Sequence, residues 1–133
     1  MMSITPVYAG LLALLLLWLS YRVVLGRRSH KVSVGDGENK DLRKRMRVQA
    51  NCAEYAPIGI VLLALLELQG VASGLLHILG LALLAGRLMH AYGLGRTPQV
   101  VKLRVWGMYL TIGSLAVSAV SNVALGVMGG FAG

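Results

Sequence analysis

Acidic residues are rare in this sequence, and charge of either sign is uncommon. Only five of the 133 residues are Asp or Glu, and 14% are charged, against about 25% in an average soluble domain. The chain is 56% apolar, and a short chain has too little interior to hide so many apolar side chains. These shortages argue against a small soluble domain and favour a protein whose surroundings are lipid.

Cysteine is scarce as well, and so are the residue groupings that bind metals. The single cysteine, Cys52, excludes an intramolecular disulfide framework. No group of His, Cys and acidic residues has the spacing of metal ligands, so we expect no metal cofactor. The net charge of +8 is confined to two short segments beside apolar runs. That pattern is typical of membrane topology signals and lipid headgroup contact, and we expect no nucleic acid partner.

Four apolar runs are long enough to cross a bilayer. They cover residues 5–25, a stretch between Asp41 and Glu67, residues 71–92 and residues 103–128. Asp41 is well placed to cap the second helix. No charge precedes Arg22, so the first run differs from a cleavable signal peptide and is expected to remain as a helix. The sequence predicts one all-α domain over residues 1–133, a left-handed four-helix bundle in the membrane.

The basic residues predict the orientation of this bundle. Nine of the thirteen lie between Arg22 and Arg47, and the other four lie between Arg87 and Arg104. The two tips and the turn after Glu67 carry none. By the positive-inside rule, both basic loops are cytoplasmic and both termini are external.

The second run contains polar residues at an unusual depth. Only 12 uncharged residues separate Glu54 from Glu67, about 18 Å of helix, whereas the hydrocarbon core is about 30 Å thick. Crossing it draws the segment from Arg47 to Glu54 down to headgroup depth or below. Polar residues there are costly unless paired, so this segment is a candidate functional site.

The spacing of this segment gathers most of its polar side chains on one helical face. Arg47, Asn51 and Glu54 are spaced i, i+4, i+7, and Tyr55 continues the stripe, whereas Gln49 points the opposite way. Arginine suits a carboxylate and a buried glutamate suits an ammonium group, so the stripe fits a small zwitterion. The alternative is an internal Arg47–Glu54 pair that only holds the bundle together.

Read from Arg47 to Pro57, the segment is Arg-x-Gln-x-Asn-x-x-Glu-Tyr-x-Pro. It resembles the signature of the membrane-associated proteins in eicosanoid and glutathione metabolism, the MAPEG family, which includes microsomal glutathione transferases and leukotriene C4 synthase. Two further motifs, Gly86–Gly93 and Arg104–Gly107, follow in the matching order. The third run and the Gly35–Gly37 loop are most similar to the small bacterial branch, which implies an integral protein of a bacterial inner membrane.

The resemblance also implies a function and an assembly. Members are homotrimers that bind glutathione as co-substrate between adjacent subunits, near the cytoplasmic face. A thiolate then attacks a small lipophilic electrophile that arrives through the bilayer, in transferase or peroxidase chemistry. Here Arg104 would stabilise the thiolate, because a cation lowers the pKa of a nearby thiol. The glutathione-binding residues implied are Arg47, Gln49, Asn51, Glu54, Tyr55, Arg27, Arg28 and His90.

Within that set, the resemblance assigns some residues to a neighbouring subunit's site. Gln49 and one of Arg27 and Arg28 would extend into the neighbouring subunit's site. His90 occupies the position at which better-known members have a tyrosine. Two alternatives remain. One is a non-catalytic membrane scaffold of the same fold. The other is a small efflux subunit, although the first span lacks the acid that small four-helix exporters typically carry there.

Overall fold

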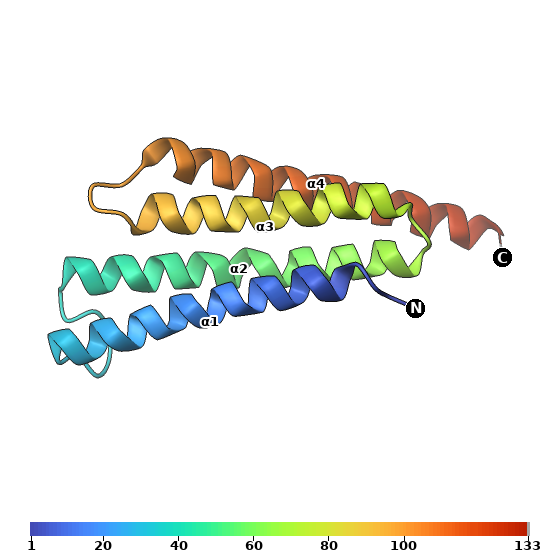
Figure 1. Ribbon diagram of the computed structural model, residues 1–133. Helices are drawn as coiled ribbons and strands as arrows, with labels where there is room; N and C mark the ends of the chain where they lie inside the picture. The colour runs from blue at the N-terminus through green and yellow to red at the C-terminus, as the bar shows by residue number, and fades with distance from the viewer. Residues whose placement is uncertain (133) are drawn as a thin grey trace.

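The computed structural model describes residues 1–132, with side chains as far as Gly129. Its four helices are α1 (Thr5–His30), α2 (Lys40–Leu68), α3 (Ser73–Gly95) and α4 (Val101–Ala132). Each is long and apolar enough to cross a membrane. They run up and down side by side, with both termini at one end and the α1–α2 and α3–α4 loops at the other (Figure 1). The prediction of an all-α, four-span membrane bundle is confirmed.

The helix ends depart from the sequence prediction where basic residues follow apolar ones. Helix α1 continues five residues past the predicted end and stops at Lys31, which takes a left-handed conformation with φ 56°. The predicted cap of α2 is wrong. Asn39 is the N-cap, and its side chain accepts a hydrogen bond from the Leu42 backbone N–H at 2.9 Å. Asp41 is the second residue of the helix, within its first turn, because Asn39 already satisfies the first free backbone donor.

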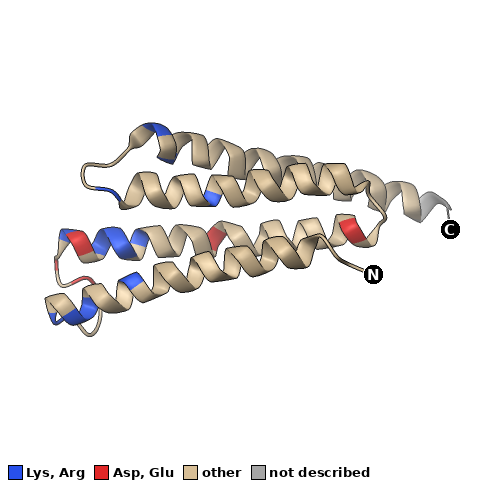
Figure 2. Cartoon of the chain, viewed as in Figure 1, with Lys and Arg blue, Asp and Glu red and all other residues tan. Residues whose placement is uncertain are grey.

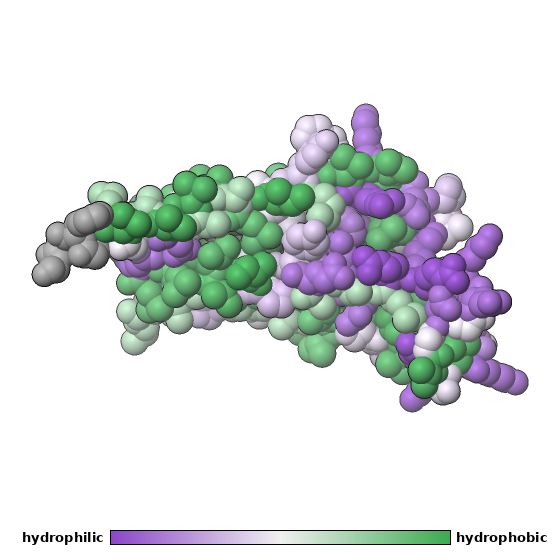
Figure 3. Space-filling model, turned by 180° about the vertical axis from the view of Figure 1, so that it is seen from behind, coloured by the Kyte–Doolittle hydropathy of each residue, from purple (hydrophilic) through white to green (hydrophobic). Residues whose placement is uncertain are grey.

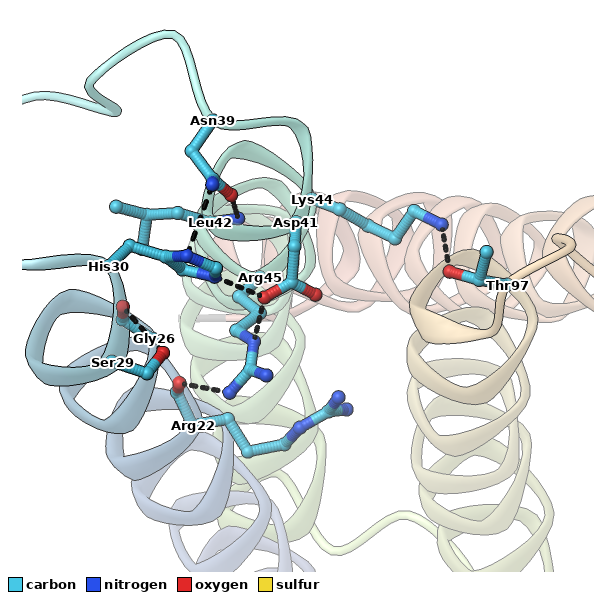
Figure 4. Close-up of polar contacts among 10 residues, drawn as sticks. All are labelled: Arg22, Gly26, Ser29, His30, Asn39, Asp41, Leu42, Lys44, Arg45 and Thr97. Carbon is cyan, nitrogen blue, oxygen red and sulfur yellow. Dashed lines mark hydrogen bonds and ion pairs between the residues drawn. The ribbon is translucent and has the colours of Figure 1, made fainter.

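Asp41 instead ties the ends of α1 and α2 together (Figure 4). Its Oδ2 accepts hydrogen bonds from His30 Nε2 at 3.1 Å and Arg45 Nε at 3.0 Å. Arg45 also donates to the Arg22 backbone carbonyl at 3.0 Å. In the connecting loop, the Arg43 guanidinium holds the pKa of the Asp36 carboxyl below its ordinary value. The loop is therefore fastened by charge at neutral pH.

The large apolar side chains of the core come from the first three helices. One cluster fills the half near the loops, and a second fills the half near the termini. The first comprises Leu12, Leu19, Val48, Cys52, Ala56, Leu83 and Ala91. The second comprises Tyr8, Leu63, Leu66, Leu76 and Leu79.

Helix α4 joins the bundle through small residues. A Cβ built on Gly107 would lie 2.5 Å from the His90 backbone nitrogen and 2.7 Å from the Gly86 carbonyl oxygen. On the same seam, the hydroxyl of buried Ser114 donates to the Leu79 carbonyl at 2.9 Å. Such close backbone approach is how membrane helices gain packing energy without a hydrophobic driving force. The α3–α4 register, which positions Arg104 against α3, therefore depends on glycine.

At the end with the termini, Glu67 of α2 caps the first turn of α1. Its carboxylate accepts backbone hydrogen bonds from Ser3 at 2.6 Å, Ile4 at 2.8 Å and Thr5 at 2.7 Å. Carboxylates at helix N-termini are favourable because they face free N–H donors and the positive end of the helix dipole. The Glu67 carboxylate therefore has a structural role.

The surface separates into a basic end and an apolar belt. Lys and Arg gather at the end with the two loops (Figure 2), and apolar residues cover most of the remaining length of the visible face (Figure 3). Large apolar side chains are exposed on all four helices, including Leu14, Val61, Ile78 and Val120. An exposed apolar belt between polar ends is what a bilayer requires of an integral membrane protein.

Candidate functional site

The charged pair of the second-helix motif lies on the surface of the single chain. Arg47 Nη1 is 3.7 Å from Glu54 Oε1, and their side chains are 59% and 53% exposed. Glu54 is thirteen residues from Glu67, or about 20 Å along the helix from the outer end. That depth is inside a hydrocarbon core of about 30 Å. Charged groups at such depth usually face a bundle interior or a polar cavity, so this exposed face of α2 is a candidate functional site.

Asn51 and Tyr55, the other members of the stripe, turn toward α3 and meet Arg87. The Arg87 guanidinium donates to the Asn51 side-chain oxygen, and to the Asn51 carbonyl at 3.3 Å. It also lies over the Tyr55 ring, 5.2 Å from the ring centroid. The predicted stripe thus consists of two parts. Arg47 and Glu54 form an exposed ion pair, and Asn51 and Tyr55 contact the buried Arg87.

Arg87 is the residue that sequence reasoning missed. It is 1% exposed, and its Nε donates to Thr111 Oγ1 at 2.9 Å, while Nη2 contacts Met108 Sδ at 3.0 Å. None of the ion pairs formed by residues 1–129 includes it. A charged residue within an apolar span is a functional-site hypothesis by default, so the signal was present within the Gly86–Gly93 motif.

A basic pocket connects α2 to the α3–α4 loop. It encloses about 340 Å³ and is lined by Lys40, Arg43, Lys44, Arg47, Leu94 and Gln99. Small-molecule sites start at about 300 Å³, so the pocket is large enough for a small ligand. Its four cations and one amide suit a ligand that carries carboxylates.

Arg104 reaches this pocket through Gln99. It lies in the first turn of α4 and is exposed, and its Nη1 donates to Gln99 Oε1 at 3.1 Å. A cation in the first turn adds its charge to the positive end of the helix dipole. Both the Arg104 guanidinium and the positive end of the α4 dipole would therefore stabilise an anion placed beside Gln99. Among residues 1–129 no group of His, Cys and acidic residues could hold a metal ion.

The remaining predicted residues are spread over the basic end. His90 is buried on α3 at the close contact with Gly107. Gln49 is half-buried on α2. Arg27 donates to the Gly35 carbonyl at 2.7 Å, which occupies part of its guanidinium within the chain. Arg28 is exposed beside a separate shallow basic pocket. The single chain therefore pairs Arg47 with Glu54 and joins Asn51 and Tyr55 to Arg87, and within the described side chains it brings none of the other four residues into the hydrogen bonds or ion pairs of either group.

Comparison with known proteins identifies the family of the chain. The MAPEG family model matches residues 5–124, which include all four spans. The chain is also similar to the inner membrane protein YecN of Escherichia coli strain K12. The two are 38% identical over 120 residues, which is 90% of each chain. The corresponding protein of E. coli O6:H1 matches to the same extent. The chain spans the inner membrane through its four helices, and it belongs to the MAPEG family.

Proposed function

We propose that the protein binds glutathione at the basic end of the bundle and transfers it to lipophilic electrophiles. The observation that carries the proposal is the basic pocket between α2 and the α3–α4 loop, which Gln99 links to Arg104. Glutathione carries two carboxylates, one ammonium group and a thiol. The cations that line the pocket suit the carboxylates. Glu54, beside Arg47, suits the ammonium group, and Arg104, beside Gln99, suits the thiolate.

The chemistry is attack by a thiolate. A free thiol with a pKa near 8.5 is only a few per cent ionised at neutral pH, and an adjacent cation raises that fraction. Arg104 has no acidic partner within residues 1–129, so its charge is available to a bound thiolate. Electrophiles would reach the sulfur from the bilayer along the apolar flank of α4, where a groove of about 390 Å³ runs from Arg104 past Tyr109.

A homotrimer completes the proposed site. The Arg47–Glu54 pair is exposed at hydrocarbon depth in the single chain, and a neighbouring copy would cover it. Gln49 and one of Arg27 and Arg28 would then contribute to the neighbour's pocket. Arg87 would position Asn51 without touching the ligand. Its bond to the Asn51 side-chain oxygen leaves the Asn51 amide N–H groups free to donate to glutathione.

The test separates binding from ionisation. Purified protein in lipid should bind glutathione, measured by calorimetry, and should show the ultraviolet absorbance of a thiolate at neutral pH. In Arg104→Ala the absorbance should fall by roughly tenfold, while Glu54→Gln should weaken binding itself. Lys102→Ala is the matched control, since it removes an exposed cation from the same turn without touching the pocket.

Two results would overturn the proposal. Absence of glutathione binding in lipid would remove its basis. Equal thiolate absorbance in Arg104→Ala and Lys102→Ala would remove the role of Arg104. Binding without conjugation of a generic electrophile would leave a glutathione-binding scaffold and refute the transferase step.

A further inference from the structure

A second groove lies between α1 and α3. It encloses about 210 Å³ near the basic end. Leucine side chains of both helices form its apolar wall, and Trp18, Arg22 and Tyr92 supply its polar groups. None of these three belongs to the glutathione pocket proposed above. The groove is therefore separate from that pocket.

Arg22 extends into this groove without an acidic partner. Figure 4 shows its side chain leaving α1 toward the helix that ends near Thr97, while only its backbone carbonyl accepts a bond, from Arg45. The guanidinium packs over the end of α3, where a Cβ built on Gly95 would lie 3.4 Å from Arg22 Nη1. No ion pair among residues 1–129 includes Arg22.

A second arginine stands beside the same opening. Arg96 follows the last residue of α3, and its guanidinium lies 5.1 Å from the centroid of the Tyr92 ring. Arg96 is exposed and, within the described side chains, forms no ion pair with a carboxylate. The Arg22 guanidinium thus lies at the groove itself, and Arg96 contacts one of its lining residues, Tyr92.

The depth of the groove matches the boundary between hydrocarbon and headgroups. Arg22 is seventeen residues after Thr5, about 26 Å along α1, in a hydrocarbon core about 30 Å thick. Trp18 and Tyr21 lie side by side, with ring centroids 6.2 Å apart, as aromatic residues do at this boundary. An arginine here can extend its head group to the phosphate level.

We propose that the α1–α3 groove is a binding site for one anionic glycerophospholipid of the cytoplasmic leaflet. The lipid phosphate lies between Arg22 and Arg96, Trp18 and Tyr92 bond its glycerol region, and an acyl chain follows the leucines toward the membrane centre. Basic pockets between helices on the cytoplasmic side suit anionic headgroups.

Charge argues against a second copy of the chain in this groove. A copy would have to supply carboxylates, and the chain has only five. Asp36, Asp41, Glu54 and Glu67 already have partners within the chain. The fifth, Glu38, lies in the loop beyond the membrane-spanning part of α1. Anionic lipid is the abundant source of negative charge at this depth.

The experiment measures lipid retention by the full-length protein. Native mass spectrometry of protein exchanged into detergent with phosphatidylglycerol should show one tightly held lipid per chain, and phosphatidylcholine should be held far less. Arg22→Gln should lower phosphatidylglycerol retention about tenfold, the ratio expected for losing one hydrogen bond to a charged group. Arg96→Gln should lower it as well. Lys102→Gln removes the same charge from an exposed site outside the groove and should leave retention unchanged.

Four outcomes would overturn the proposal. One is equal retention in Arg22→Gln and Lys102→Gln, and a second is equal retention of the anionic and zwitterionic lipids. A third is a change of oligomeric state in Arg22→Gln with lipid retention intact, which would identify the groove as a contact between copies. Competition by millimolar glycerol phosphate as strong as by the lipid would assign the site to a free phosphate. Circular dichroism of Arg22→Gln and Arg96→Gln should match the parent, so that loss of the lipid reports on the groove and not on folding.

Discussion

Gly107 sets how closely α4 can approach α3, and replacing it with alanine should force the two helices apart. The added Cβ would lie 2.5 Å from the His90 nitrogen and 2.7 Å from the Gly86 carbonyl oxygen. Ordinary contact between such atoms is at about 3.5 Å, so the backbones must separate locally by about 1 Å. Neither neighbour is a side-chain end that can rotate away, because both atoms belong to the α3 backbone.

The size of the effect follows from two opposing terms. Overpacking a tight contact costs about 1–3 kcal/mol, and a rigid backbone neighbour favours the upper part of that range. Alanine is preferred over glycine in a helix by about 1 kcal/mol. We therefore expect Gly107→Ala to lower the free energy of unfolding by about 1–2 kcal/mol. Gly113→Ala, on the same helix with nothing within 4 Å of its added Cβ, should raise it by about 1 kcal/mol.

The difference between these variants is the quantity to measure, because both gain the same helix preference. Equilibrium unfolding in mixed micelles with increasing dodecyl sulfate, followed by circular dichroism, should place Gly107→Ala about 2–3 kcal/mol below Gly113→Ala. If the two agree within about 0.5 kcal/mol, then the α3–α4 seam is not close-packed in the way described, and the positioning of Arg104 by glycine contact must be abandoned.

Two more expectations concern buried polar groups. Arg87→Met keeps most of the side-chain volume but removes the bonds to Asn51 and Thr111, and at about 0.6 kcal/mol per bond in a membrane protein it should cost about 2 kcal/mol in the same unfolding assay. If the variant is as stable as the parent, the desolvation cost of burying the Arg87 guanidinium equals the stabilisation from its hydrogen bonds. Glu67→Gln weakens the acceptor for the amides of Ser3, Ile4 and Thr5, so hydrogen exchange at these amides should accelerate severalfold while global stability changes little; unchanged exchange would contradict the cap.

The four spans could be predicted because hydropathy is a local property of the sequence. The predicted spans lie within the observed helices to within a few residues at most ends. The misplaced ends lie where a helix runs on into basic residues, as α1 does through Arg27 and Arg28 to His30. In the headgroup region the backbone gains from helical hydrogen bonds whatever the side chains are, so composition alone cannot locate the last turn. The cap of α2 was misassigned because Asn39 and Asp41 are both good capping residues, and only the backbone decides between them.

The residues of the candidate site could be predicted from the sequence, but the neighbours that their side chains contact could not. The spacing of Arg47, Asn51 and Glu54 placed them on one face, and the structure keeps the outer two together at 3.7 Å. Asn51 turns toward Arg87, a partner 36 residues away. Helical spacing describes one helix by itself, so a contact with α3 lies outside what it can predict. The roles of Arg104, His90 and the residues assigned to a neighbouring subunit stay predictions that the experiments above address.

The Glu67 carboxylate has a consequence for the order in which the protein is made. The backbone donors at the start of α1 are satisfied by a residue more than sixty positions later in the chain. While the ribosome is still synthesising α2, those amides have only water and headgroups as partners. They gain their protein partner when the far end of α2, with the Glu67 carboxylate, has been made and packed beside α1. Completion of the first hairpin therefore caps α1 at the end that holds the termini, and a chain stalled before that point would present an uncapped, exchangeable first turn.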